Sequence, residues 1–134
     1  MIVIDSSVVL AIYLKEPDAL VLAAAIVDDP DPVISAATLL ECSIAIRSRK
    51  SSDVGEAEQW LDSLVTELRL QVLAVDEVQS RIARAAPVSY GKGTGHPAQL
   101  NFGDCFAYAL AKAMDVPLLF KGDDFTKTDI RSAL

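Results

Sequence analysis

Four acidic positions, far apart in the chain, each stand where a β-strand would end or a helix would begin. They are Asp5, Glu41, Asp104 and the Asp123-Asp124 pair. Converging carboxylates repel one another, so a cluster of them is stable mainly when a divalent cation or a proton lies between them. Oxygen ligands without a companion His or Cys suit hard cations. The set therefore predicts a site for Mg²⁺, with Mn²⁺ as the alternative.

Such a site favours phosphodiester hydrolysis, because one or two metal ions can bind the phosphate, activate water and stabilise charge on the leaving oxygen. Each acid taken alone has a simpler interpretation, since acids in the first helical turn satisfy free amide groups. Asp5 can cap a helix, Glu41 can complete a capping box with Thr38, and Asp104 stands three residues after Asn101. Only the four positions together predict a nuclease.

Strands and helices alternate between these acids. Short apolar runs predict strands at residues 2–4, 33–34, 72–75 and 118–120, and apolar spacing and capping residues predict helices at 8–12, 17–27, 38–49 and 54–68, after Asp76 and after Asn101. This order predicts an α/β fold with a central, mainly parallel sheet and helices on both faces. In such sheets the functional crevice lies beyond the carboxyl ends of the strands, where the acids fall.

Size and composition predict one compact domain, residues 1–134, in the cytoplasm. The chain has 134 residues, of which 51% are hydrophobic and 23% charged, which argues against disorder. No apolar run approaches the roughly 18 residues of a membrane span, and the first residues lack the basic start of a secretory signal. Cys42 and Cys105 lack the paired spacing of zinc or disulfide frameworks, so we expect buried thiols.

The net charge of −7 counts against binding of nucleic acid as a whole-molecule property. Basic residues are nevertheless grouped, as Arg47, Arg49 and Lys50, and as Lys92 in a glycine-rich loop at residues 90–97. They predict contacts with an RNA backbone if cations mask the nearby carboxylates, with solvated surface charge as the alternative. The only histidine, His96, lies in the same loop, and we expect it to be an exposed bystander.

Four segments resemble, in order and spacing, the signatures of VapC-type PIN-domain toxins. They are Ile-Val-Ile-Asp-Ser-Ser at residues 2–7, Leu-Glu at 40–41, Leu-Asn-Phe-Gly-Asp-Cys at 100–105 and Leu-Leu-Phe-Lys-Gly-Asp-Asp-Phe at 118–125. The resemblance implies a PIN-like three-layer α/β/α sandwich. It also implies catalytic metal ligands at Asp5, Glu41 and Asp104, with Asp124 as the fourth acid and Asp123 as its alternative.

The resemblance has further implications for activity and partners. It implies an endoribonuclease that cleaves structured cellular RNA, tRNA or rRNA, as the growth-arresting toxin of a type II toxin-antitoxin pair. It implies a homodimer, and a heterotetramer or larger assembly with a cognate VapB-type antitoxin. Ser6 would position a ligand or a water, although it is also an ordinary residue for a helix start.

Two other classes of function remain open from the sequence. A phosphoacceptor signalling domain also uses an acidic Mg²⁺ pocket at strand ends, but it needs an acceptor Asp that ends a mid-chain strand, and none precedes the helix with Glu41. A non-catalytic interaction module would use the acids only as caps. A metal ion that raises the midpoint of thermal unfolding would distinguish a metal site from caps.

Overall fold

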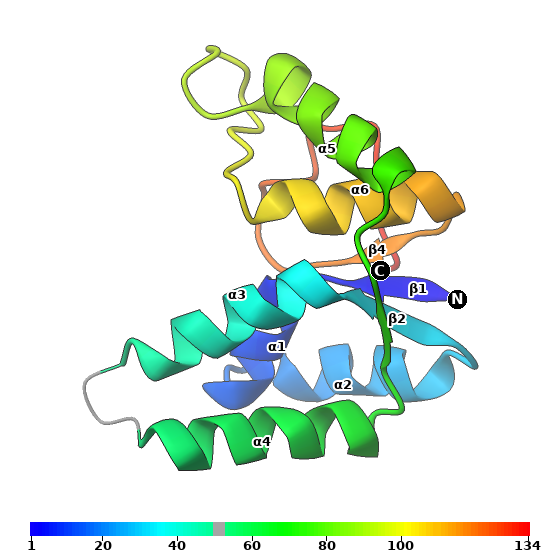
Figure 1. Ribbon diagram of the computed structural model, residues 1–134. Helices are drawn as coiled ribbons and strands as arrows, with labels where there is room; N and C mark the ends of the chain where they lie inside the picture. The colour runs from blue at the N-terminus through cyan, green and yellow to red at the C-terminus, as the bar shows by residue number, and fades with distance from the viewer. Residues whose placement is uncertain (50–52) are drawn as a thin grey trace.

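A four-stranded parallel sheet forms the centre of the computed structural model, which describes residues 1–49 and 53–134 (Figure 1). Its strands are β1 (Ile2–Ile4), β2 (Pro32–Ser35), β3 (Gln71–Leu73) and β4 (Leu118–Leu119), in the order β3-β2-β1-β4. All three neighbouring pairs are parallel, and Val3 in β1 pairs with Val33 on one side and Leu118 on the other. The predicted α/β fold with a central parallel sheet is confirmed.

Helices cover both faces of this sheet and complete three layers. They are α1 (Ser6–Tyr13), α2 (Ala19–Asp28), α3 (Ala36–Arg47), α4 (Val54–Glu67), α5 (Glu77–Tyr90) and α6 (Asp104–Met114). The first four pack into the hydrophobic core on one face, and α5 and α6 pack into a second core on the other. In the described part of the chain, no helix is long and apolar enough to span a membrane.

Side chains of the inner strands alternate between the two cores. Ile2 and Ile4 lie in the first core and Val3 lies in the second. In β2, Ile34 lies in the first core and Val33 in the second. A strand covered on both faces must be apolar at every position, which explains the continuous Ile-Val-Ile run of β1. Each fully buried aliphatic side chain contributes roughly 1.5–3 kcal/mol to folding. The cores thus fix the sheet that positions the site.

The start of α3 differs from the prediction. Ser35 caps this helix, because its hydroxyl accepts a hydrogen bond from the Ala37 amide at 3.3 Å. Thr38 lies one turn further along, fully buried, so the predicted capping box between Thr38 and Glu41 is wrong. Sequence spacing favoured the box, but the serine that ends β2 supplies the cap three residues earlier. Glu41 is therefore not used as a capping residue.

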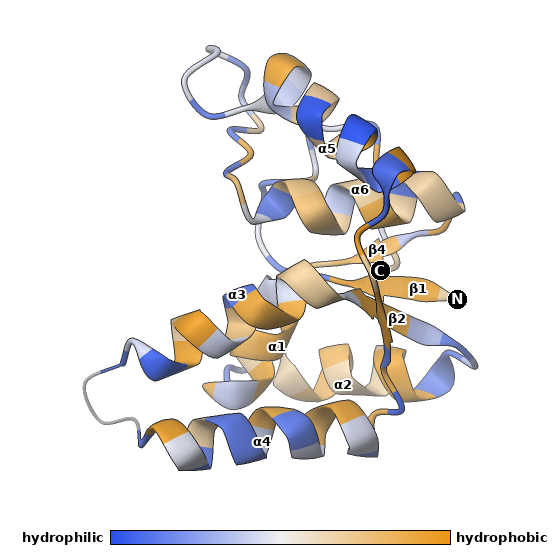
Figure 2. Cartoon of the chain, in the orientation of Figure 1, coloured by the Kyte–Doolittle hydropathy of each residue, from blue (hydrophilic) through white to orange (hydrophobic). Residues whose placement is uncertain are grey.

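Other boundaries shift by a few residues. Helix α2 begins at Ala19, after Asp18, and not at Pro17, while β3 ends at Leu73 instead of residue 75. The predicted cap at Asp76 is confirmed by a 2.8 Å bond from the Gln79 amide. Helix α5 shows alternating polar and apolar stretches that match a helix with one face on the core (Figure 2).

Candidate active site

The parallel topology brings the acidic positions to one edge of the sheet. Asp5 follows β1, Glu41 lies in the helix that follows β2, and Asp123 and Asp124 follow β4. Asp104 begins α6, whose residues share a core with β1, β2 and β4. Since the carboxyl ends of parallel strands meet at the same edge, this is the crevice that the sequence predicted.

Asp5 is a buried carboxylate that also caps α1. The residue is only 2% exposed, and its Oδ2 accepts hydrogen bonds from the Ser7 amide at 3.0 Å and the Ser7 hydroxyl at 2.6 Å. Burial raises the pKa of Asp5 and outweighs these bonds, and the charge of Asp124 raises it further. Its other oxygen, Oδ1, is buried with no hydrogen-bond partner among the described residues. A capping role alone does not explain that oxygen.

Glu41 points from α3 toward the same space. Burial raises the pKa of Glu41, the charge of Asp5 adds to this rise, and a hydrogen bond with the Ser6 side chain opposes it. Its Oε2 is a second buried oxygen without a partner in the described chain. The carboxylate lies directly against Gly103, where an added Cβ would stand 2.2 Å from Oε1. Only a residue without a side chain at position 103 leaves room for the Glu41 carboxylate in this position.

Asp104 is fixed by reciprocal hydrogen bonds at the start of α6. Its Oδ2 accepts from the Asn101 amide at 2.9 Å, and its own amide donates to Asn101 Oδ1 at 3.0 Å. The residue is 6% exposed, and burial raises its pKa to about 7. The Asn101 bond lowers that pKa, while the charges of Asp5, Asp124 and Glu41 raise it. Asp104 therefore lies close enough to each of the other three carboxylates for their charges to act on it.

The structure separates the two neighbouring acids after β4. The charge of the exposed Asp124 raises the pKa of both Asp5 and Asp104, whereas the charge of Asp123 contributes to neither rise. The Asp123 carbonyl instead accepts bonds from Thr126 in a surface turn. This placement favours Asp124 as the fourth acid, and its role in catalysis stays a prediction.

The nuclease predicted from the sequence should cleave RNA more slowly after Asp124→Asn, because this substitution removes a negative charge that acts on Asp5 and Asp104. We expect the cleavage rate to fall at least about tenfold, which is the loss that usually follows replacement of a residue that supports a metal ligand. Asp123→Asn is the matched control and should retain the parent rate. Initial cleavage rates of the two variants at equal concentration measure this, and equal losses would contradict the assignment.

Ser7 and Lys121 also support the site, although neither was predicted from the sequence to do so. Ser7 Oγ donates to Asp5 and accepts from the Lys121 amide at 2.9 Å. The Lys121 ammonium forms ion pairs with Glu16 and with Asp18, the latter at 2.9 Å. These contacts hold the segment after β4 against the start of α1. A helix cap accepts from the second or third helical amide, so the rule for caps could have identified Ser7.

The predicted basic contacts are spread over different places. Arg47 is exposed and pairs with Glu58 of α4 at 3.6 Å, and Arg49 is exposed beyond the end of α3. Lys50 lies outside the described residues. Lys92 lines a groove between α5 and α6. Of the three predicted contacts that the structure describes, Lys92 alone lines this groove.

The two remaining predictions concern the histidine and the thiols. His96 is half-buried, its ring packs edge-on against Tyr90, and its Nδ1 accepts a bond from the Ala98 amide at 3.1 Å. The predicted exposure is wrong, because the ring packs within its own loop, and the expectation that His96 takes no part in catalysis stays a prediction. Both cysteines are buried and unpaired, as predicted.

The donor atoms suit a hard divalent cation. Asp5 Oδ1 and Glu41 Oε2 are buried oxygens without partners, and the surrounding acids supply further oxygens and no nitrogen or sulfur. Within residues 1–49 and 53–134, no group of three or more His, Cys, Asp or Glu side chains already stands in a ligand arrangement. The fit to a metal ion therefore rests on the oxygen-only donor set and on the two buried oxygens without partners.

Comparisons with known proteins point to one family. The PIN domain family model matches residues 2–131. Over 132 residues the chain is 43% identical to "Ribonuclease VapC28" of Mycobacterium tuberculosis, covering 98% of this chain and 97% of that protein.

Two solved structures have the same fold. The structure of the Mycobacterium tuberculosis toxin VapC20, described as sarcin-ricin loop cleaving, superposes with a TM-score of 0.74 at 14% identity, over 97% of this chain and 96% of that one. VapBC2 of Rickettsia felis, bound to a DNA fragment of its promoter, superposes with a TM-score of 0.72 at 16% identity, over 95% and 92% of the two chains.

Proposed function

We propose that this chain, which belongs to the PIN-domain family and is similar to its VapC ribonucleases over nearly its whole length, is an endoribonuclease that requires Mg²⁺. We propose further that it is the toxin of a toxin-antitoxin pair. The observation that carries the proposal is the convergence of Asp5, Glu41 and Asp104 from three different elements. Burial raises the pKa of each of them, and the charge of at least one nearby acid, which is Asp124 in the case of Asp5, raises it further. Such an arrangement is costly without a counter-charge, so selection for a site explains it better than capping does.

The side chains have two roles, because some would bind the metal ion and others position the residues that bind it. Asp5, Glu41 and Asp104 would bind Mg²⁺, with Mn²⁺ as the alternative, and Asp124 would complete the set at the exposed rim. When bound, the ion would polarise the scissile phosphate and lower the pKa of a water molecule. Ser7 and Asn101 keep Asp5 and Asp104 in place through the hydrogen bonds described above. No histidine is needed as general base.

The proposed partners are structured RNA, tRNA or rRNA, and a VapB-type antitoxin, in the cytoplasm. The names of the relatives support both partners. Exposed Leu40 and Ile44 on α3 line a groove together with Glu41, so a protein segment lying there would cover the acidic site. A homodimer, and a heterotetramer or larger assembly with the antitoxin, form part of the same proposal.

The phosphoacceptor alternative has no support from the strand ends. In the described chain β2 ends at Ser35 and β3 at Leu73, so neither mid-chain strand presents an acceptor aspartate. A non-catalytic module predicts acids that do not respond to metal. Thermal unfolding with and without Mg²⁺, together with RNA cleavage, separates this reading from the nuclease.

The metal-free chain is expected to lose stability as pH rises from about 4 to about 7, because the unfolded chain then releases a proton that folded Asp104 still holds. The raised pKa values of Asp5 and Glu41 act in the same direction. Mg²⁺ binds the ionised acids of the folded state, so it should raise the midpoint more at about pH 8 than at about pH 5.

Calorimetry with EDTA or Mg²⁺ at the two pH values measures this, alongside cleavage of total cellular RNA under the same conditions. The proposed function would be contradicted if neither Mg²⁺ nor Mn²⁺ changed the unfolding midpoint and the chain did not cleave RNA.

A further inference from the structure

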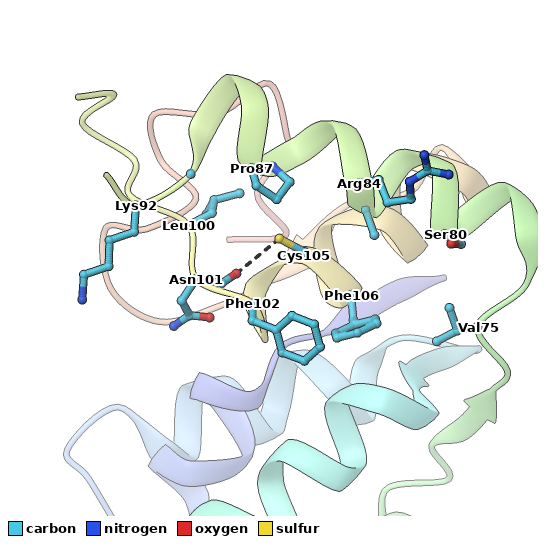
Figure 3. Close-up of a pocket in the computed structure, with 12 residues that line it drawn as sticks. Val75, Ser80, Arg84, Pro87, Lys92, Leu100, Asn101, Phe102, Cys105 and Phe106 are labelled. Atoms are coloured by element: carbon cyan, nitrogen blue, oxygen red, sulfur yellow. Dashed lines mark hydrogen bonds between the residues drawn. The ribbon is translucent and has the colours of Figure 1, made fainter. Parts of the chain in front are cut away.

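Two apolar grooves meet beside the acidic site. The larger, of about 660 Å³, lies between α5 and α6 (Figure 3), and the smaller, of about 530 Å³, lies between α3 and α6. Asn101, Phe102 and Phe106 line both of them. Each volume falls within the range of about 300–1,000 Å³ that is usual for sites that bind small organic groups.

Phe102 separates the grooves and is held in an exposed position. Its side chain is 82% exposed, although it stands two residues before the buried Asp104. The ring packs edge-on against Phe106, with centroids 5.0 Å apart and an interplanar angle of 88°. Reciprocal hydrogen bonds between Asn101 and Asp104 fix the backbone on both sides. An exposed ring that is fixed in this way can offer a face to a ligand at little entropic cost.

Charges along the grooves suit an RNA strand. Glu41 and Gly103 line the smaller groove, which therefore opens onto the carboxylates. Arg84 and Lys92 line the larger groove, and Figure 3 shows them on opposite sides of Phe102. Neither of these cations has an ion-pair partner in the part of the chain that is described. Unpaired cations in a groove that an aromatic ring also lines suit a nucleic-acid strand, whose phosphates are negatively charged and whose bases can stack on the ring.

We propose that Phe102 stacks on an unpaired nucleobase next to the scissile phosphate, and that the α5–α6 groove receives this base while Lys92 and Arg84 bind the flanking phosphates. This subsite rests on the proposed ribonuclease function and narrows its substrate class. A base in a duplex is stacked on its neighbours and cannot enter the groove. The subsite therefore requires an unpaired base.

The test uses binding of a single-stranded oligoribonucleotide that carries 2-aminopurine, in chains that also carry Asp5→Asn to prevent cleavage. Stacking on Phe102 should quench the fluorescence of the probe. Phe102→Leu keeps an apolar side chain but removes the aromatic face, and it should weaken affinity about tenfold and relieve the quench. Phe102→Trp should preserve both. Leu20→Ala is the matched control, since Leu20 is 84% exposed on α2, a helix that lines neither groove.

The outcomes separate this inference from the function on which it rests. Unchanged affinity and quench in Phe102→Leu overturn the subsite and leave the grooves to a protein partner. Equal competition by a duplex of the same sequence also overturns it. Binding that depends on Phe102, in a parent chain that cuts no RNA with Mg²⁺ or Mn²⁺, supports the subsite and contradicts the nuclease. Where the parent cuts, Phe102→Leu should raise KM with little change in kcat.

Discussion

Asp5→Asn is expected to abolish RNA cleavage and, in metal-free buffer, to make the chain more stable. The substitution removes a buried negative charge that burial and Asp124 both disfavour. An asparagine oxygen can still accept the hydrogen bonds from Ser7, so the cap of α1 is kept. Activity and stability therefore change in opposite directions, as they do where a functional site is destabilising.

The loss of cleavage should exceed the about 10–100-fold that follows removal of an outer partner of a metal ligand. Mg²⁺ should then raise the unfolding midpoint less than in the parent. Asp62→Asn, at an exposed position on α4, removes the same charge away from the site and should alter neither property. An Asp5→Asn chain that cleaves at the parent rate would remove the basis of the proposed site.

The sequence predicted the sheet, and the placement of the acids at its edge, for one physical reason. Residues 2–4 and 33–34 are apolar at every position because they are covered on both faces, and Asp5 follows such a run directly. Parallel pairing then brings Asp5 together with the acids that follow the other strands. Strand and helix ends were less predictable, because Ser35 and Thr38 are equally suitable caps and only tertiary packing decides between them.

Contacts between distant segments could not be predicted from local patterns. Asp123 and Asp124 are neighbours with the same chemistry, yet only the charge of Asp124 raises the pKa of Asp5 and Asp104. The hydrogen bond between Ser7 and Lys121 joins residues 114 positions apart. Neither position has a periodicity or a motif that indicates such a contact.

Gly103 is the clearest example of a residue whose role only the structure reveals. Its backbone is in the ordinary helical region, with φ of −63° and ψ of −41°, so an alanine can adopt it without strain. The glycine is required for space, because an added Cβ would stand within 2.6 Å of both carboxylate oxygens of Glu41. These atoms are the far end of a flexible side chain. Gly103→Ala should therefore displace the Glu41 carboxylate and leave the fold intact.

We expect Gly103→Ala to reduce cleavage about 100-fold, since a displacement of about 1 Å at a catalytic centre can cost that much. Its unfolding midpoint should be unchanged or slightly higher, because alanine lowers the entropy of the unfolded chain. Gly55→Ala on α4 is the matched control. The nearest atom to its added Cβ is Asp53 Oδ1 at 3.3 Å, and Asp53 is not one of the acids of the proposed site. This control should cleave like the parent.

The mechanism of the Gly103→Ala loss can be tested with a double variant. If the added methyl group acts only by displacing Glu41, it has nothing left to displace once that side chain is removed. Glu41→Ala with Gly103→Ala should then cleave no more slowly than Glu41→Ala alone, because the two changes affect one carboxylate and are not additive. Losses that multiply in the double variant would show that Gly103 supports α6 or Asp104 directly, and would contradict this role for the glycine.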